Sequence, residues 1–178
     1  MGILNLDAFT TSRLSAERLT PAHRGEIARM HQDPDVMEHL GGVRNAEQTE
    51  EYLERNLAHW DRYGYGLWML RRPEGGELVG RAVLRHLTLE DRDELETGYA
   101  FYRPYWGRGL ATEVARRCVR MAFEILAAES VVGLTLPANH ASQRVLIKTG
   151  MSRDREVRHA GALHVLLRVT RTAWSAGG

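Results

Sequence analysis

The feature that most constrains the fold is a long amphipathic helix with a strand signal on either side. Apolar residues over 110–127 recur at helical spacing and form one stripe. The run 94–102 before this helix and the run 131–136 after it both predict strands. A strand, a helix and a second strand in this order predict a βαβ unit. The stripe consists of Leu110, Val114, Cys118, Met121, Ala122 and Ile125.

Shorter elements surround this unit, and turn or cap residues bound several of them. Thr20-Pro21 is typical of a helix start, and Pro73 to Gly76 is typical of a hairpin turn. The order of elements predicts a mixed α/β (α+β) fold around a largely antiparallel sheet of about seven strands with about four helices. We expect residues 1–12 to form a leader and 13–173 a single domain. The other expected elements are strands over 13–19, 67–72, 78–87, 152–159 and 163–172, and helices over 20–33, 46–63 and 139–149.

Composition narrows the class of protein. The 178 residues carry 24 basic and 23 acidic side chains, a balance that argues against nucleic-acid binding driven by charge. The single cysteine, Cys118, excludes an intramolecular disulfide framework. No apolar run reaches the roughly 20 residues of a membrane helix, and the N-terminus does not resemble a signal peptide. We therefore expect a cytoplasmic protein that binds neither membrane nor nucleic acid. The 24 basic residues are 23 arginines and one lysine, Lys148, which indicates a GC-rich genome.

The turn before the amphipathic helix has features of a ligand-binding site. Gly107 and Gly109 allow a sharp turn and a close approach of a ligand to the backbone. The first amides of the following helix lack intrahelical acceptors and lie at the positive end of its dipole. This arrangement favours a bound phosphate, although the spacing alone also fits a plain turn. The segment is neither a Walker loop nor a Rossmann fingerprint, because the residues that complete those motifs are missing.

Short motifs stand in a fixed order from about residue 11 to residue 172. They are Thr11-Ser12-Arg13-Leu14, Asp33-Pro34-Asp35-Val36-Met37, Gly64-Tyr65-Gly66-Leu67-Trp68, Leu78-Val79-Gly80-Arg81, Glu96-Thr97-Gly98-Tyr99, the run Tyr105 to Glu113, Pro137-Ala138-Asn139-His140-Ala141-Ser142, and the run Val145 to Met151. In order and spacing they resemble the GNAT superfamily of acetyl-CoA-dependent N-acetyltransferases, and within it the RimJ/RimL type. The resemblance implies that acetyl-CoA is the co-substrate. It also implies that a protein N-terminal α-amine or a small-molecule amine attacks it directly in a ternary complex.

The resemblance also assigns residues to coenzyme A. The backbone from Trp106 through Ala111, with Thr112, would hold the pyrophosphate. The strand segment 99–101 would pair with the pantetheine amides, and Asn139 would hydrogen-bond pantetheine. Lys148, Arg108 and Arg144 would either contact the nucleotide phosphates or remain solvated charges. The full cofactor set is Tyr99, Ala100, Phe101, Trp106, Gly107, Arg108, Gly109, Leu110, Ala111, Thr112, Asn139, Ser142 and Lys148.

Two residues are candidates for proton transfer. Glu96 shares a strand face with Gly98 and Ala100, and it would take the proton of the incoming amine directly or through water, unless it is a surface acid. Ser142 would protonate the leaving thiolate, unless it is a helix-surface hydroxyl. Leu146 stands where many superfamily members have a tyrosine that does this work, which strengthens the candidacy of Ser142 or water.

Other side chains are weaker candidates for a functional role. Cys118 lies on the apolar stripe, which favours a core residue over an acyl carrier. His159 and His164 flank the last hairpin, where substrate would enter. No histidine motif predicts a metal site. The aromatic residues near the second helix fit a core better than an acceptor pocket; they are Tyr52, Trp60, Tyr63, Tyr65 and Trp68.

The sequence leaves three matters open. A regulatory module that binds coenzyme A without turnover is the main alternative to an enzyme. An enzyme that transfers a larger acyl group is another. A homodimer is the default assembly.

Overall fold

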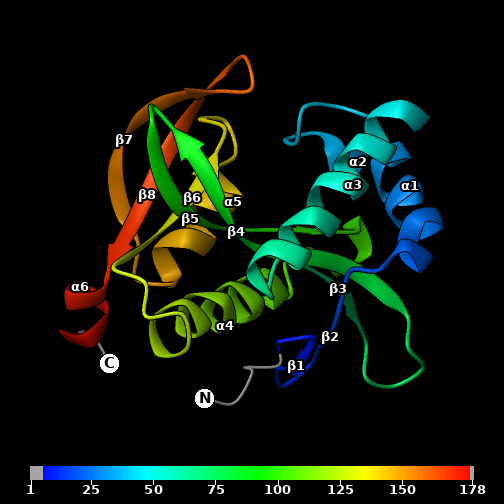
Figure 1. Ribbon diagram of the computed structural model, residues 1–178, viewed down its shortest axis with the longest axis horizontal. Coiled ribbons are helices and arrows are strands. Elements are labelled where there is room, and N and C mark those ends of the chain that lie inside the picture. Colours follow the sequence, from blue (N-terminus) through cyan, green and yellow to red (C-terminus); the bar gives the residue numbers. More distant parts are fainter. Residues whose placement is uncertain (1–5, 177–178) are drawn as a thin grey trace. The chain divides into compact units, whose positions relative to one another are not determined.

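The structure, a computed structural model, describes residues 6–176 and confirms a mixed α/β fold (Figure 1). Among these residues are one eight-stranded sheet, six α-helices and two 3₁₀ helices. The strand order is β1-β2-β3-β4-β5-β6-β8-β7. The strands are β1 (Ala8–Thr10), β2 (Ser15–Arg18), β3 (Leu67–Arg71), β4 (Leu78–Leu89), β5 (Arg92–Phe101), β6 (Ser130–Thr135), β7 (Ser152–His159) and β8 (Ala162–Thr170). The helices are η1 (Pro21–His23), α1 (Arg24–Gln32), α2 (Pro34–Met37), α3 (Ala46–Tyr63), η2 (Arg103–Tyr105), α4 (Leu110–Glu124), α5 (His140–Lys148) and α6 (Arg171–Ala176).

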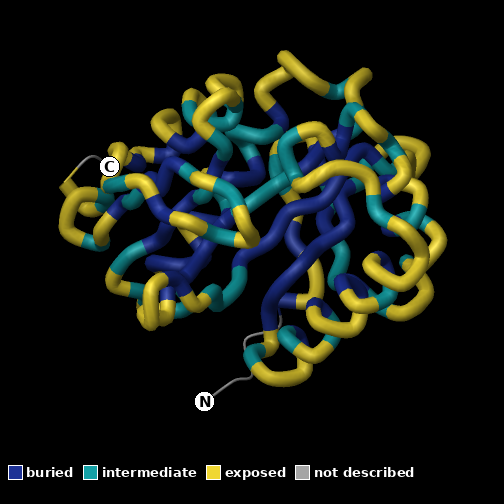
Figure 2. Tube along the Cα trace, turned by 90° about the horizontal axis from the view of Figure 1, so that it is seen from above, coloured by how far each residue is buried: buried dark blue, intermediate teal, exposed yellow. Residues whose placement is uncertain are grey.

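The chain divides into two compact units. The first unit comprises Met1–Ala82 and Tyr99–Leu110, and the second comprises Val83–Gly98 and Ala111–Gly178. Strands β4 and β5 and helix α4 each contribute residues to both units. Most residues of strands β3, β4, β5 and β6 are buried, most residues of β7 are exposed, and the connecting turns are mostly exposed (Figure 2).

The first unit packs its core around two tryptophans. Strand β2 pairs antiparallel with β1 and with β3. Trp60 of α3 and Trp68 of β3 are fully buried, and their ring centroids lie 5.4 Å apart. Each indole N–H is satisfied by a backbone carbonyl, Trp60 by Leu67 at 2.9 Å and Trp68 by Leu6 at 2.8 Å. The predicted aromatic core is therefore present.

Helix α3 has the bounds that its sequence predicts. Asn45 caps its first turn, because the Asn45 side chain accepts from the backbone N–H of Gln48 at 2.8 Å. The Gln48 side chain accepts in return from the backbone N–H of Asn45 at 3.0 Å, which completes a capping box. Gly64 ends the helix in the left-handed region, with φ of 73°.

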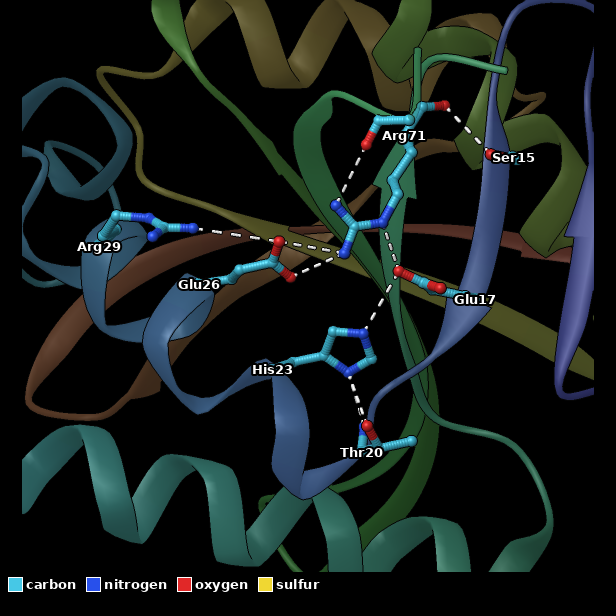
Figure 3. Close-up of polar contacts among 8 residues, drawn as sticks. Ser15, Glu17, Thr20, His23, Glu26, Arg29 and Arg71 are labelled. Carbon is cyan, nitrogen blue, oxygen red and sulfur yellow. Dashed lines mark hydrogen bonds and ion pairs between the residues drawn. The ribbon is translucent and has the colours of Figure 1, made fainter. Parts of the chain in front are cut away.

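An ion-pair network joins the first helices to strands β2 and β3 (Figure 3). The Arg71 guanidinium donates to the Glu17 carboxylate at 2.5 Å and to the Glu26 carboxylate at 2.9 Å. The ring of His23 accepts from the backbone N–H of Thr20 at 2.9 Å, so its other nitrogen carries the proton that faces Glu17 at 3.3 Å. Burial acts to raise the pKa of Glu17, but Arg71 and His23 outweigh it and lower that pKa.

The second unit contains the βαβ connection. Strand β5 pairs parallel with β6 through Glu96 opposite Val132. Strand β8 pairs antiparallel with both β6 and β7 (Figure 1). One buried cluster there joins Leu89, Val132, Val157 and Leu166.

Several expected bounds were wrong, and each error has a local cause. The turn expected over 88–93 contains only two residues outside strands, Glu90 and Asp91, both with positive φ, so β4 and β5 run further toward each other. Helix α2 was missed because Asp33 both ends α1 and caps a new helix through the backbone N–H groups of Asp35 and Val36. Helix α6 was missed because Thr170 ends β8 and accepts from the backbone N–H of Ala173 at 3.2 Å.

The expected leader, residues 1–12, contains strand β1, and residues 1–5 lie outside the described residues. The expectation of a single domain over 13–173 stays a prediction. None of the described helices is long and apolar enough to cross a membrane.

Candidate active site

The turn that the sequence predicts to bind phosphate, residues 106–112, follows β5, and we call it the cradle. Residues 106–110 belong to the first unit. After Phe101 the chain forms η2 and then a turn in which Gly107 and Gly109 have φ of 70° and 77°. Residues other than glycine rarely adopt this backbone conformation, so both positions favour glycine whatever space surrounds them. Helix α4 starts at Leu110. Ala111 and Thr112 lie in its first turn, whose amides have no intrahelical acceptors.

The space around this turn is open on the side of the glycines. A Cβ placed on Gly107 would meet no atom of the described residues within 4 Å, and one on Gly109 would meet only the Arg13 guanidinium at 3.5 Å. Arg13 donates to the carbonyl of Arg108 at 2.7 Å, which ties the turn to the start of the chain. Trp106 donates through its indole N–H to the carbonyl of Phe101 at 2.7 Å. These bonds hold the turn without filling the space beside its amides.

The strand segment 99–101 is held tightly by β4. A Cβ on Gly80 would lie 2.3 Å from the carbonyl oxygen of Ala100 and 3.1 Å from the Cα of Phe101. The backbone N–H of Tyr102 donates to the carbonyl of Val79 at 3.0 Å. Close backbone packing therefore fixes the position of the segment that the sequence assigns to pantetheine.

The basic residues that could contact the nucleotide phosphates are all exposed. The guanidinium of Arg108 lies 5.7 Å from the ring centroid of Tyr105, within the turn region of the first unit. Arg144 and Lys148 lie on α5 in the second unit. The carbonyl of Lys148 accepts from Arg116 at 3.1 Å. Their roles toward phosphate stay predictions.

Glu96 is a buried carboxylate paired with an arginine, in the second unit. Only 7% of the residue is exposed, so the interpretation as a surface acid is wrong. Its Oε2 accepts from Nε of Arg85, on β4, at 2.8 Å. The sequence analysis missed Arg85. The signal was available, since Arg85 and Glu96 are equally far along the chain from the turn at Glu90 and Asp91.

The charges of Glu96 and Arg85 also act on His159, which lies on β7. Burial lowers the pKa of His159, and the charges of His164 and Arg85 lower it further, against an opposing effect of Glu96. The rings of His159 and His164 are 5.8 Å apart. A histidine with a lowered pKa is neutral at pH 7 and has a free lone pair. The cluster of Arg85, Glu96, His159 and His164 thus offers two groups that can accept a proton.

Asn139 and Ser142 occupy the first turn of α5. The Asn139 side chain caps the helix, because its oxygen accepts from the backbone N–H of Ser142 at 3.0 Å. The amide nitrogen of Asn139 remains the atom through which it would donate to pantetheine. In this hydrogen bond the serine contributes its backbone N–H.

Cys118 is a core residue, as its position on the stripe predicts. The side chain is fully buried in α4. Burial raises the pKa of its thiol to about 12, although Thr97 and Arg117 act in the opposite direction. The thiol is therefore protonated at neutral pH and cannot act as an acyl carrier.

A profile of the acetyltransferase (GNAT) domain family matches residues 13–152. This chain belongs to the GNAT acetyltransferase family. The family match covers both the turn before α4 and the first turn of α5.

Individual relatives agree with the family assignment. The Bacillus subtilis protein YkkB is 34% identical over 126 residues, which are 71% of this chain and 73% of YkkB. The FsC-acetyl coenzyme A-N(2)-transacetylase of Aspergillus fumigatus is 31% identical over 153 residues, and the match spans 80% of this chain but only 63% of that enzyme. The crystal structure of an acetyltransferase from Agrobacterium tumefaciens superposes with a TM-score of 0.81 at 25% identity and covers 95% of this chain and 97% of that one.

Within this GNAT chain, Leu146 is a packing residue. A Cβ on Gly133 would lie 2.6 Å from a methyl carbon of Leu146, which is fully buried. The position therefore carries no proton donor. The expected site residues divide between the units: the first holds Tyr99, Ala100, Phe101 and 106–110, and the second holds Glu96, Ala111, Thr112, Asn139, Ser142 and Lys148.

Proposed function

We propose that this GNAT protein transfers an acetyl group from acetyl-CoA to a primary amine. The observation that carries the proposal is the turn before α4, where two glycines with positive φ leave open space beside the backbone. Backbone amides at a helix N-terminus suit a pyrophosphate, because they donate hydrogen bonds and the helix dipole favours negative charge. The residues 106–112 would hold the pyrophosphate, and 99–101 would pair with pantetheine.

The proposed chemistry uses residues of the second unit. The amine nitrogen forms a bond to the thioester carbonyl carbon while the carbon–sulfur bond breaks. Glu96 would accept the proton that the amine loses, directly or through water, and Ser142 would give a proton to the leaving sulfur. Arg85 would hold Glu96 in place for this role, because its Nε donates to Oε2 of Glu96 at 2.8 Å. His159 is the second candidate base. The protonated, buried thiol of Cys118 supports direct attack without an acyl-enzyme.

A glycine substitution tests the cradle. Gly109→Val should weaken acetyl-CoA binding by at least about 2 kcal/mol, roughly thirtyfold in Kd, because it blocks the approach of the pyrophosphate to the amides. Calorimetric titration with acetyl-CoA measures the change.

Gly75→Val is the matched control for this variant. Gly75 has φ of 80° and open space around its Cβ position, so valine there carries the same backbone strain away from the cradle. We expect its affinity for acetyl-CoA to stay at the wild-type value. A folded Gly109→Val variant with unchanged affinity would refute the placement of the pyrophosphate.

The acceptor should be an amine with a low pKa. Peptide α-amines titrate near 8 and lysine side chains near 10.4, so at pH 7 deprotonation costs roughly 1.4 and 4.6 kcal/mol respectively. A site with one carboxylate and one neutral histidine as bases should favour the α-amine. We expect α-amino peptides or small low-pKa amines to react faster than lysine side chains at pH 7, with a gap that narrows as pH rises.

A competition experiment tests both the acceptor and the activity. A lysine-free peptide with a free N-terminus competes with an N-terminally blocked lysine peptide, and mass spectrometry follows both products from pH 6.5 to 9. Faster modification of the lysine peptide across this range would contradict the expected preference. Acetyl-CoA binding without release of free thiol for any amine would instead identify a regulatory module.

Several finer assignments belong to the proposal. They are membership of the RimJ/RimL subgroup, a bacterial source, a cytoplasmic location, and a homodimer without membrane or nucleic-acid partners. The order of motifs and the near-neutral charge support them.

A further inference from the structure

Three arginines surround one buried tyrosine in the first unit. The guanidinium carbons of Arg44, Arg81 and Arg55 lie 4.9, 5.1 and 5.8 Å from the ring centroid of Tyr52. Arg44 follows α2, Arg55 and Tyr52 belong to α3, and Arg81 belongs to β4. With His31, whose ring lies 4.7 Å from that of Tyr52, these residues form what we call the Tyr52 cluster.

Two polar atoms of the Tyr52 cluster are buried without a partner. Arg81 is 6% exposed, and its Nε has no hydrogen-bond partner in the described part of the chain. Tyr52 is 4% exposed, and its hydroxyl also lacks a partner there. No carboxylate of the described residues forms an ion pair with Arg81. A buried guanidinium is costly unless an anion compensates its charge, so the arrangement calls for one from outside the chain.

His31 does not supply negative charge, but it orients one of the arginines. Arg44 can only donate, so Nε2 of His31 must accept from Nη1 of Arg44 at 3.2 Å. The protonated Nδ1 of His31 then donates to the hydroxyl of Thr49 at 3.0 Å. Burial, together with the charges of Arg44 and Arg81, lowers the pKa of His31 to about 3. A neutral histidine thus holds Arg44 in place.

Through Arg81, the Tyr52 cluster adjoins the part of β4 that packs against the proposed cofactor strand. Arg81 directly follows Gly80, the residue whose backbone packs against Ala100 and Phe101. That strand segment is the one we assign to pantetheine. Arg55 is exposed and Arg44 is partly exposed, so the cluster extends from a buried guanidinium to the surface.

We propose that Arg81, Arg44 and Tyr52 bind a carboxylate group of the amine acceptor. The planar edge of a guanidinium matches the two oxygens of a carboxylate, and the Tyr52 hydroxyl adds one more donor. The assignment to the acceptor rests on the proposed acetyl transfer, whereas the binding of a carboxylate does not. The acceptor class is then a small amino acid or peptide that carries a carboxylate as well as its amine.

Binding is tested without any turnover. Acetate is titrated into the ¹⁵N-labelled protein at constant ionic strength, and the Nε–Hε signal of Arg81 is followed, assigned by its loss in Arg81→Met. We expect a saturable shift of this signal. Arg62→Met is the matched control, because Arg62 lies 5.0 Å from the ring of Tyr63 on the same helix but at the surface. It should leave the Arg81 response unchanged. An Arg81 signal that does not respond to acetate, or that saturates at lower concentration with inorganic phosphate, would overturn the carboxylate site.

The acceptor assignment is tested by kinetics. Acceptors are compared in pairs that differ only in a carboxylate: Ala-Glu amide against Ala-Gln amide, and Ala-Ala against its amide. We expect the acidic member of at least one pair to have the lower KM, and Arg81→Met to raise that KM about tenfold while the KM of the amide stays within twofold. Tyr52→Phe, which removes only the hydroxyl, should raise the same KM by a smaller factor.

The acetate titration tests the carboxylate site, and the kinetic comparison tests whether the carboxylate belongs to the acceptor. If acetate shifts the Arg81 signal but both members of each pair have equal KM values, the carboxylate does not come from the acceptor. If no amine releases thiol, the proposed function fails and the acetate titration still decides the carboxylate site. If Arg81→Met does not fold, the signal is assigned by its loss in Arg81→Lys, and the wild-type titration and Tyr52→Phe then provide the test.

Discussion

Replacing Glu96 by glutamine is expected to lower turnover about 10²-fold, with acetyl-CoA affinity nearly intact. The amine acceptor is mostly protonated at neutral pH, and glutamine cannot take its proton. Loss of this base should also move the pH–rate profile upward, since the amine must then lose its proton to solvent. Steady-state kinetics from pH 6 to 10 and calorimetric binding of acetyl-CoA measure both effects.

Glu94 provides a matched control for this variant. It lies two residues earlier on β5, is also buried, and accepts two hydrogen bonds from Arg168 at 2.7 and 2.8 Å. Glu94→Gln removes the same charge from the same strand, so it should destabilise the fold without the large loss of turnover per folded molecule. Wild-type turnover in Glu96→Gln, with a large loss in His159→Ala, would transfer the role of base to His159.

Replacing Ser142 by alanine should also lower turnover about 10²-fold and leave acetyl-CoA affinity unchanged. Alanine retains the backbone N–H of Ser142 through which Asn139 caps α5, so this cap remains in the variant. Single-turnover thiol release separates the chemical step from binding.

Ser152→Ala is the control for the serine substitution. Ser152 is an exposed residue at the start of β7 and has no role in the proposal. Its turnover should equal that of the wild type. If Ser142→Ala also keeps the wild-type rate, the leaving sulfur takes its proton from water.

Local sequence was sufficient to predict several elements of this GNAT fold. The bounds of α3 follow from Asn45, Gln48 and Gly64, which act on the helix ends within one turn. The glycine turn before α4 was predicted for the same reason, since positive φ at Gly107 and Gly109 is a property of two residues and their neighbours. Where one residue served two elements, as Asp33 and Thr170 do, local reasoning assigned only one of the roles.

The candidate site depended on contacts that no local pattern contains. Glu96 is a buried partner of Arg85 because a strand register brings β4 and β5 together. The charge of this carboxylate acts on His159 of β7 and opposes the lowering of its pKa. In the sequence Glu96 and His159 belong to separate elements, and no local pattern links them.

The sequence by itself determined the order of most elements, the caps of α3 and the glycine turn before α4, because hydrogen bonds within a few residues and the allowed φ of glycine fix these features. Only the tertiary structure decided which charges are buried together. Arg81, Arg44 and Tyr52 come from a strand, a loop and a helix, and they meet because the core of the first unit packs these elements against one another. The environment of a charge depends on such long-range packing, so the buried arginine of this chain could be found only in its fold.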